Sequence, residues 1–300
     1  MTYEVMSIDE ALEDTGLKML VYSKGGYGKT VMCATAGKPT LIISAEQGLI
    51  SIKGAPKFVK VAKITCFDDL DDIYDDLSEG NIPCSWVCLD SISDVAEVLL
   101  SEEKEMSKDG RQFYGNLADK MNKMIRKFRD LPNINVLFTC KQKRITDTDT
   151  GRTTYIPSLP GNQLTENINY MFDFVFALRI EEDDDGEPYR TLQCEPDNSY
   201  DAKSRGEFLN DFEPPNLKKL EMKIRGEDYE PYVKKTKVQK EKERLAAEKE
   251  AEEKELEENE IDNEQTTGPE VDDIPEDDYE TEVEETENND EDIEEETAEE

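Results

Sequence analysis

Three glycines, a lysine and a threonine stand close together near the start of the chain, in the stretch VYSKGGYGKT (Val21 to Thr30). In a glycine-rich turn, backbone N–H groups can point at phosphate oxygens, and a lysine beside them adds positive charge. A hydroxyl directly after that lysine suits Mg²⁺ when a nucleotide is bound. The pattern therefore predicts a phosphate-binding loop that uses ATP and Mg²⁺.

The predicted loop is an unbroken run of eight residues. They are Ser23, Lys24, Gly25, Gly26, Tyr27, Gly28, Lys29 and Thr30. We expect Lys29 to reach the β and γ phosphates and Thr30 to hold Mg²⁺, while the following helix adds its positive amino-terminal end. The common pattern begins with glycine, so Ser23 departs from it. The alternative is a glycine-rich turn with a chance Gly-Lys-Thr.

An acidic residue ends the apolar stretch SWVCLDS, about 60 residues after the loop. Asp90, at the end of a strand beside the loop, would bind Mg²⁺ through water. The letters DSISD also suit a helix N-cap, which is the alternative interpretation.

Two further polar side chains follow apolar runs. Glu46 comes after TLIIS, and Gln142 comes after NVLFTC. At the carboxyl edge of an open α/β sheet, a carboxylate can activate a water against the γ phosphate, and an amide can sense that phosphate. The alternatives are a solvated loop glutamate and a surface glutamine.

The elements that must position these residues alternate between apolar runs and helical patterns, which predicts an α/β fold with a mostly parallel sheet flanked by helices. Strands are expected at 18–22, 39–44, 57–62 or 63–67, 86–89 and 135–140, and helices from residue 29, at 68–80 and at 116–131. Residues 141–161 are expected to form a hairpin around 149–151, and 172–180 and 189–195 an antiparallel pair.

In this order the motifs resemble the RecA-like ATPases, and more narrowly the phage-encoded AAA-family ATPases associated with single-strand annealing and recombination. The resemblance covers residues 16–220 and rests on SKGGYGKT, ISAEQGL, CLDSISD, YGNLADKMNKMIRKFRDLPNINVLFTCKQK, IPSLPG, NYMFDFVFALR and DAKSRGEFLNDFEPPNLKKL. It implies a RecA-like P-loop ATPase that acts on single-stranded DNA as a homo-oligomer, with Glu46 catalytic. It also implies that Lys203 and Arg205 meet the phosphates, including those of a neighbouring subunit.

Two other functions remain open. K-G-G-x-G-K-T is also the loop of partition and division-site ATPases, in which the early lysine, here Lys24, reaches a partner's nucleotide. That family carries an aspartate-rich turn after its second strand, where this chain has SAEQGL. The second alternative is a nucleotide-dependent scaffold or loader that barely hydrolyses.

The net charge of −37 requires any DNA-binding surface to be local. The first predicted surface comprises Lys141, Lys143, Arg144, Arg152 and Tyr155. Cations would follow the DNA backbone, and the ring would stack a base. A second lies in EKEMSKDGRQFYG, with Lys108, Arg111, Phe113 and Tyr114. For both, the alternative is a solvated loop.

Composition divides the chain into an ATPase domain at 1–230, a charged helical extension at 231–260 and a disordered acidic tail at 261–300. Residues 241–300 hold 31 acidic and 4 basic side chains, a net charge of −27. The tail could provide solubility, compete with DNA for the basic loop, or recruit phage or host single-strand binding or replication proteins.

Other features predict a cytoplasmic protein, in a bacterial host cell if it is phage-encoded. The amino terminus lacks a basic start and a long apolar run, and no segment reaches the roughly 18 apolar residues of a membrane span. Six cysteines without a C-x-x-C pair are expected to be reduced thiols. The absence of histidine excludes Ser-His-Asp and Cys-His catalysis and disfavours zinc.

Overall fold

The structure is a computed structural model that describes residues 7, 15–45, 48–106, 109–148 and 150–227. The chain divides into two compact units, Met1–Tyr232 and Val233–Glu300, and the described residues belong to the first. The predicted extension at 231–260 and acidic tail at 261–300 lie outside the described residues, so the predicted domain limits stay predictions.

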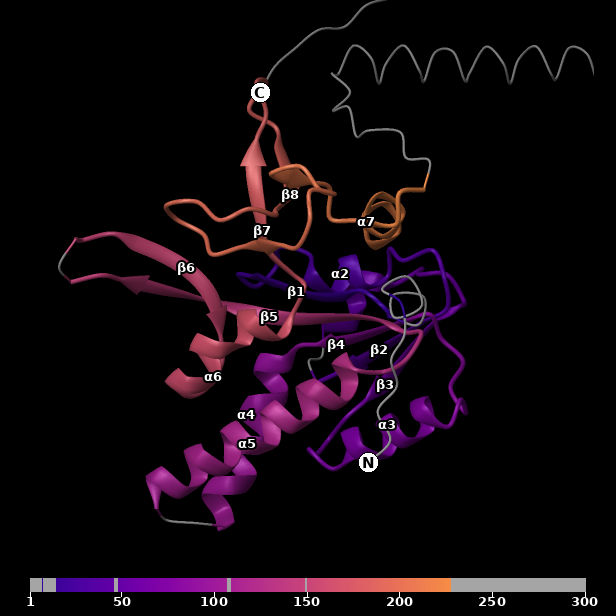
Figure 1. Ribbon diagram of the computed structural model, residues 1–300, viewed down its shortest axis with the longest axis vertical. Coiled ribbons are helices and arrows are strands. Elements are labelled where there is room, and N and C mark those ends of the chain that lie inside the picture. Colours follow the sequence, from indigo (N-terminus) through magenta and orange to yellow (C-terminus); the bar gives the residue numbers. More distant parts are fainter. Residues whose placement is uncertain (1–6, 8–14, 46–47, 107–108, 149, 228–300) are drawn as a thin grey trace, which may run out of the picture. The chain divides into compact units, whose positions relative to one another are not determined.

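A single ten-stranded sheet runs through the described part of the chain (Figure 1). Its main path has the order β10-β8-β7-β1-β5-β4-β2-β3, with β6 paired to β5 and β9 to β7. The pairs from β7 through to β3 are parallel, and those that involve β6, β8, β9 and β10 are antiparallel. The strands are β1 Lys18–Ser23, β2 Thr40–Ser44, β3 Val59–Lys63, β4 Trp86–Asp90, β5 Asn135–Thr146, β6 Thr153–Ser158, β7 Phe174–Glu182, β8 Pro188–Gln193, β9 Lys203–Ser204 and β10 Phe212–Glu213.

Helices cover both faces of this sheet. Successive side chains of a strand point to opposite faces, and the buried strands carry apolar side chains on both. Leu20 and Tyr22 of β1 pack in the cluster formed with α3, α4, α5 and α6, whereas Met19 and Val21 pack in the cluster formed with α2 and α7. The helices are α2 Lys29–Cys33, α3 Asp69–Ser78, α4 Ile92–Met106, α5 Gly110–Arg129, α6 Asn162–Asn167 and α7 Leu217–Ile224, with 3-10 turns η1 Gly48–Ile52 and η2 Ile168–Met171. The predicted α/β fold class, with a mostly parallel sheet between helices, is confirmed.

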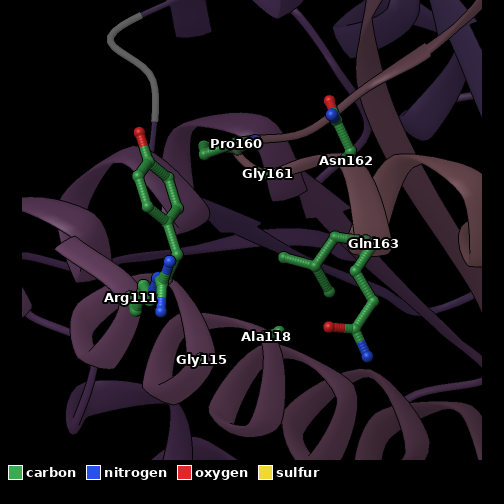
Figure 2. Close-up of a pocket in the computed structure, with 9 residues that line it drawn as sticks. Arg111, Gly115, Ala118, Pro160, Gly161, Asn162 and Gln163 are labelled. Carbon is green, nitrogen blue, oxygen red and sulfur yellow. The ribbon is translucent and has the colours of Figure 1, made fainter.

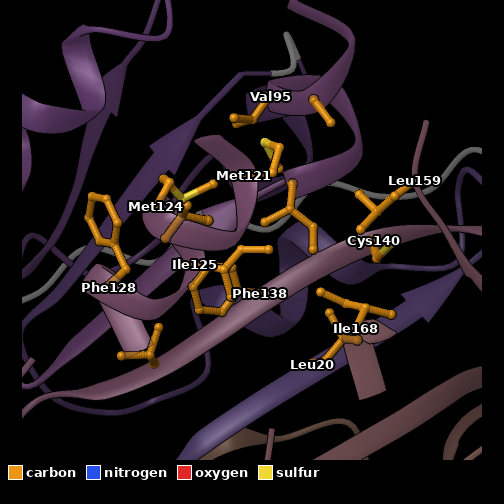
Figure 3. Packing of buried hydrophobic residues seen from close by; sticks show 14 of the residues in the cluster. Leu20, Val95, Met121, Met124, Ile125, Phe128, Phe138, Cys140, Leu159 and Ile168 are labelled. Carbon is orange, nitrogen blue, oxygen red and sulfur yellow. The ribbon is translucent and has the colours of Figure 1, made fainter. Parts of the chain in front are cut away.

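The apolar spacing that predicted a helix at 116–131 belongs to α5. Met121, Met124, Ile125 and Phe128 are buried against the sheet, where Phe138 of β5 meets them (Figure 3). The helix begins earlier than predicted, because the Asp109 side chain accepts a hydrogen bond from the Arg111 N–H and caps its first turn.

The last helix is held by a buried carboxylate. Glu221 of α7 accepts hydrogen bonds from Trp86 Nε1 and Asn135 Nδ2, each at 3.1 Å, and pairs with Lys38 Nζ at 2.8 Å. A buried charge must have such partners, so this network fixes α7 to β4 and β5.

β5 differs from the prediction in a way that matters for function. Instead of ending at Cys140, it continues to Thr146 and pairs with β6 in an antiparallel hairpin that extends from the sheet (Figure 1). The predicted hairpin is thus confirmed, but Gln142 lies within the strand and not after it. The apolar run predicted only the buried half of β5. The exposed half contains Ile145 and Thr146, whose β-branched side chains favour a strand.

No helix among the described residues is long and apolar enough to cross a membrane. All six cysteines are free, and four of them are buried. The cytoplasmic location stays a prediction.

Candidate functional site

The predicted phosphate loop joins the end of β1 to the start of α2, at the carboxyl edge of the parallel strands. Gly26 (φ 79°) and Gly28 (φ 107°) adopt a left-handed backbone that favours glycine. A cavity of about 350 Å³ lies over the loop. Its lining residues are Gly25, Gly26, Gly28, Lys29, Thr30, Val31, Gly48, Ser51 and Arg190.

Lys29 is the charged group at the base of this loop. Its Nζ donates to Ser23 O, Ser23 Oγ and Lys24 O, each at 3.3 Å, and the residue is 9% exposed. Ser23, the departure from the common pattern, therefore holds the lysine with its hydroxyl. Because α2 has only five residues, the loop N–H groups and Lys29 supply most of the positive potential, rather than a long helix dipole.

The candidate metal site lies beside Lys29. Thr30 Oγ1 donates to Asp90 Oδ2 at 2.6 Å, and Thr139 Oγ1 donates to Asp90 Oδ1 at 2.6 Å. Asp90 is buried at the end of β4. Hydroxyl and carboxylate oxygens are the hard ligands that Mg²⁺ takes, so this donor set fits the ion.

The nucleotide must complete such a site. Among the described residues there is no group of three or more His, Cys, Asp or Glu side chains that could hold a metal ion. Mg²⁺ held by one or two carboxylates relies on substrate phosphates for further ligands. When bound, the ion neutralises charge on the β and γ phosphates.

Glu46 lies outside the described residues, and its catalytic role stays a prediction. The chain on either side of it reaches the metal site. Ala45 N donates to Asp90 O at 3.0 Å, and a Cβ built on Gly48 would lie 3.8 Å from Thr30 Oγ1.

The two residues after Cys140 lie where β5 leaves the core. Lys141 Nζ pairs with Asp94 Oδ1 at 2.7 Å and with Glu97 Oε1 at 2.9 Å. Gln142 is half-buried and stands opposite Pro157 of β6. Two carboxylates thus engage the first cation of the predicted DNA surface, and the sensing role of Gln142 stays a prediction.

The other predicted cations lie along the hairpin. Arg144 is exposed, with Nη2 3.3 Å from Thr153 Oγ1. Lys143 is half-buried on the same strand. Arg152, near the turn, donates to the carbonyls of Asn198 and Asp197 at 2.8 and 3.2 Å.

Tyr155 has an internal partner that the sequence did not indicate. Its ring stacks on Tyr200 with centroids 4.9 Å apart, and Lys24 Nζ lies 6.0 Å from the Tyr155 ring centroid. Its backbone carbonyl accepts a hydrogen bond from Tyr22 at 2.9 Å. Tyr200 thus occupies one face of the ring, and the expected stacking of a base on Tyr155 stays a prediction. Lys24 contacts its own chain, and its action on a neighbouring subunit stays a prediction.

The two late cations have structural partners. Lys203 Nζ donates to the carbonyls of Asn169 and Phe172 at 3.1 and 2.7 Å, and burial lowers the pKa of Lys203. Arg205 Nη1 pairs with Asp173 Oδ1 at 2.8 Å.

These two cations lie near the start of β1, whereas the phosphate loop of the same chain follows its end. Asp173 N donates to Lys18 O at the start of β1, whereas the loop follows Ser23 at its end. At about 3.3 Å per residue, those ends are about 17 Å apart. A role toward a neighbouring subunit stays a prediction for Lys203 and Arg205.

Sequence reasoning missed two residues of the loop region. Thr139, which orients Asp90, was detectable as a lone hydroxyl in the apolar run NVLFTC. Arg190 donates from its Nε to Tyr27 O at 2.8 Å. No motif in the sequence predicts this contact, because only the folding of the chain brings β8 beside the loop.

A second cavity, of about 570 Å³, lies between the start of α5 and the loop before α6 (Figure 2). It is lined by Arg111, Tyr114, Gly115, Ala118, Pro160, Gly161, Asn162, Gln163 and Leu164. The fold thus brings two members of the second predicted DNA surface, Arg111 and Tyr114, to one cavity. Lys108 lies outside the described residues.

The sequence matches the protein family described as AAA domain over residues 15–206, more than half of the chain. The chain belongs to this family. It therefore has a P-loop ATPase domain of the AAA type, and the family implies the use of nucleotide and Mg²⁺.

Among solved structures, the KaiC-like protein PH0186 of Pyrococcus horikoshii OT3 is similar at 15% sequence identity, over 59% of this chain and 77% of that chain, with a TM-score of 0.36. That degree of likeness carries no conclusion about this AAA-family chain. No curated protein matches it.

Proposed function

We propose that this AAA-family ATPase is phage-encoded and hydrolyses ATP to act on single-stranded DNA in recombination or strand annealing. The order of the sequence motifs supports the phage and recombination assignment. The course of β5 carries the proposal that the ATP site and DNA are coupled.

β5 connects the candidate metal site with the basic hairpin. It pairs with β1, which leads into the loop, and with β4, which ends at Asp90. Its Thr139 contacts Asp90, and Lys143 and Arg144 follow on the part of the strand that forms the hairpin. Four residues of strand span about 13 Å, so a change at Asp90 has a short rigid path to these cations.

A second contact joins the same regions at the base of the hairpin. Ser93, at the start of α4, accepts a hydrogen bond from Lys141 N at 2.9 Å and donates to Ser158 O at 2.8 Å. Asp90 is only three residues earlier in the chain. A shift at Asp90 would thus act on β5 and β6 together.

In this proposal the residues at the loop divide the work. Lys29 neutralises phosphate charge, Thr30 and Asp90 hold Mg²⁺, and Glu46 takes the proton of the attacking water. In a homo-oligomer, Lys203 and Arg205 would face the nucleotide of the neighbouring subunit.

The DNA surface that we propose has two parts. Lys143, Arg144 and Arg152 of the hairpin would follow the phosphates. Tyr114, which is 45% exposed, would stack a base in the cavity that Arg111 also lines. The hairpin connects the two parts, because β6 runs from Thr153, next to Arg152, to Ser158, two residues before Pro160, which lines the cavity.

ATP hydrolysis with and without single-stranded DNA tests the coupling. We expect single-stranded DNA to stimulate turnover, and Lys29→Ala to abolish it without lowering the melting temperature. Binding of ATP without turnover would instead favour a scaffold, and stimulation by duplex alone would favour a partition ATPase. Turnover that no DNA stimulates would contradict the coupling.

Tyr114→Ala tests the cavity. Stacking of a base on an aromatic ring contributes about 1–3 kcal/mol, so binding of a labelled oligonucleotide should weaken by roughly 5- to 150-fold. Tyr170→Ala, which removes a 78% exposed tyrosine from η2, is the matched control and should leave affinity unchanged. Equal affinities of both variants and the wild type would remove the cavity from the DNA surface.

A further inference from the structure

Arg190 lies directly against the backbone of the phosphate loop, although it comes from β8 at the other end of the domain's sequence. Its Nε donates to Tyr27 O at 2.8 Å. A Cβ built on Gly28 would meet Arg190 Nε at 3.3 Å and Cδ at 3.4 Å. Arg190 also lines the cavity over the loop, together with Lys29 and Thr30.

The sheet order places this arginine on one flank of the loop and the metal site on the other. β1 leads into the loop and has β5 and then β4 on one side, with Asp90 at the end of β4. On its other side come β7 and then β8, which carries Arg190. A triphosphate on the loop would thus have Mg²⁺ on one flank and a guanidinium on the other.

The Arg190 guanidinium has N–H donors that are available to a ligand. Arginine carries five N–H donors, and Nε uses one of them on Tyr27. Within the described residues, Arg190 forms no ion pair, and its Nη atoms make no hydrogen bond. Arg190 is exposed at the edge of the phosphate loop, so these donors are accessible to an anionic ligand in the cavity. Two parallel Nη–H groups match the oxygens of a phosphate.

We propose that Arg190 binds the nucleotide in its own subunit, through the phosphates that ATP and ADP share. Lys29, Thr30 and Asp90 serve the β and γ phosphates from the loop base and the β4 flank, which leaves the opposite flank to Arg190. The residue therefore sets nucleotide affinity and does not sense the γ phosphate. This inference rests on the ATPase function of the loop.

Calorimetric titration of the full chain with ADP and with ATP, both with Mg²⁺, tests the assignment. Arg190→Gln should weaken both nucleotides by the same factor, at least about tenfold, as expected for hydrogen bonds to a charged group. KM for ATP should rise by a similar factor, with kcat at saturation close to wild type. Arg190→Lys should keep part of the affinity, because it keeps the charge.

Arg129→Gln is the matched control, since Arg129 ends α5 and pairs with its neighbour Asp130 at 2.6 Å. It should bind both nucleotides as the wild type does. The melting temperature without nucleotide should be the same for wild type, Arg190→Gln and Arg129→Gln.

Three results would overturn the assignment. They are unchanged affinity in Arg190→Gln, loss confined to ATP with a fall in kcat, and a lower melting temperature of the nucleotide-free variant, which would mean that Arg190 only fixes Tyr27. A wild type that binds ADP but does not turn over ATP would contradict the proposed function while leaving this test intact.

Discussion

Asp90 gives one carboxylate oxygen to Thr30 of the loop and the other to Thr139 of β5. Two hydroxyl donors fix the plane of the carboxylate, and burial keeps water from competing for it. An oriented acid beside a hydroxyl is what a site for hydrated Mg²⁺ requires. The chemistry at this scale thus depends on three residues from three separate elements.

Changing Glu46 to Gln tests which acid activates water. The substitution keeps the size of the side chain and removes the carboxylate, so nucleotide binding should survive. Turnover should fall about a hundredfold or more, as general bases typically contribute. The measurement is steady-state hydrolysis together with ADP and ATP affinity.

Asp94→Asn is the comparison for this prediction, because Asp94 is the acid of α4 nearest in sequence to Asp90 and already pairs with Lys141. We expect only a small effect on turnover. A large loss in Asp94→Asn with normal turnover in Glu46→Gln would reverse the assignment.

Side-chain chemistry was predictable from the sequence where neighbouring residues create it, as in the loop from Ser23 to Thr30. It was not predictable where the fold creates it. Arg190 reaches the loop because β8 lies beside β7, and a turn places Lys203 and Arg205 near the start of β1. No local sequence pattern predicts that Arg190 contacts the loop or that Lys203 and Arg205 lie near the start of β1.

At the scale of elements, apolar runs located the buried strands and helical spacing located α5. Burial produces both patterns, because residues that face the core must be apolar. They located exposed segments less well. The outer half of β5 is amphipathic and charged, so its pairing with β6 lengthens it beyond the apolar run. α7 is short and carries a buried acid, Glu221, which composition alone would place in solvent.

Glu221→Gln tests the attachment of α7. Burial alone would raise the pKa of Glu221, but hydrogen bonds from Lys38, Trp86 and Asn135 outweigh it and lower that pKa. The charge therefore stabilises the fold above the unfolded pKa of about 4.3, and this stabilisation is lost as the pH falls through the lower folded pKa. At pH 7 the variant should lose about 1–3 kcal/mol of unfolding free energy.

Urea unfolding of both proteins across pH checks this expectation. The difference between wild type and variant should shrink steadily as the pH falls below about 4.3. Glu166→Gln, on the exposed side of α6, is the control and should match the wild type throughout. A constant difference across pH would mean that the charge of Glu221 contributes nothing.

At the scale of the whole molecule, charge is divided unevenly along the sequence. Residues 241–300 carry a net charge of −27 out of the total of −37. They lie outside the described residues, and their composition predicts that they do not fold alone. A tethered polyanion has a high effective concentration and can compete with DNA for a basic surface on the same chain.

Deleting residues 241–300 should therefore tighten binding of single-stranded DNA, most of all at low salt. For single strands, each phosphate contact contributes about −0.7 to the slope of log affinity against log salt. Replacing Lys143, Arg144 and Arg152 should flatten that slope by roughly two units. Lys141 is left in place, because Asp94 and Glu97 already engage it.

The two changes must interact if the tail and DNA compete for one surface. The gain from tail deletion should then be smaller in the triple variant than in the wild-type hairpin, and oligonucleotide titrations of all four proteins at several salt concentrations measure the difference. Equal gains in both backgrounds would mean that the tail acts elsewhere. If the truncated protein binds no better than the full chain at low salt, the tail is not an internal competitor. Recruitment of a single-strand binding or replication protein, or solubility, then becomes the better account of its charge.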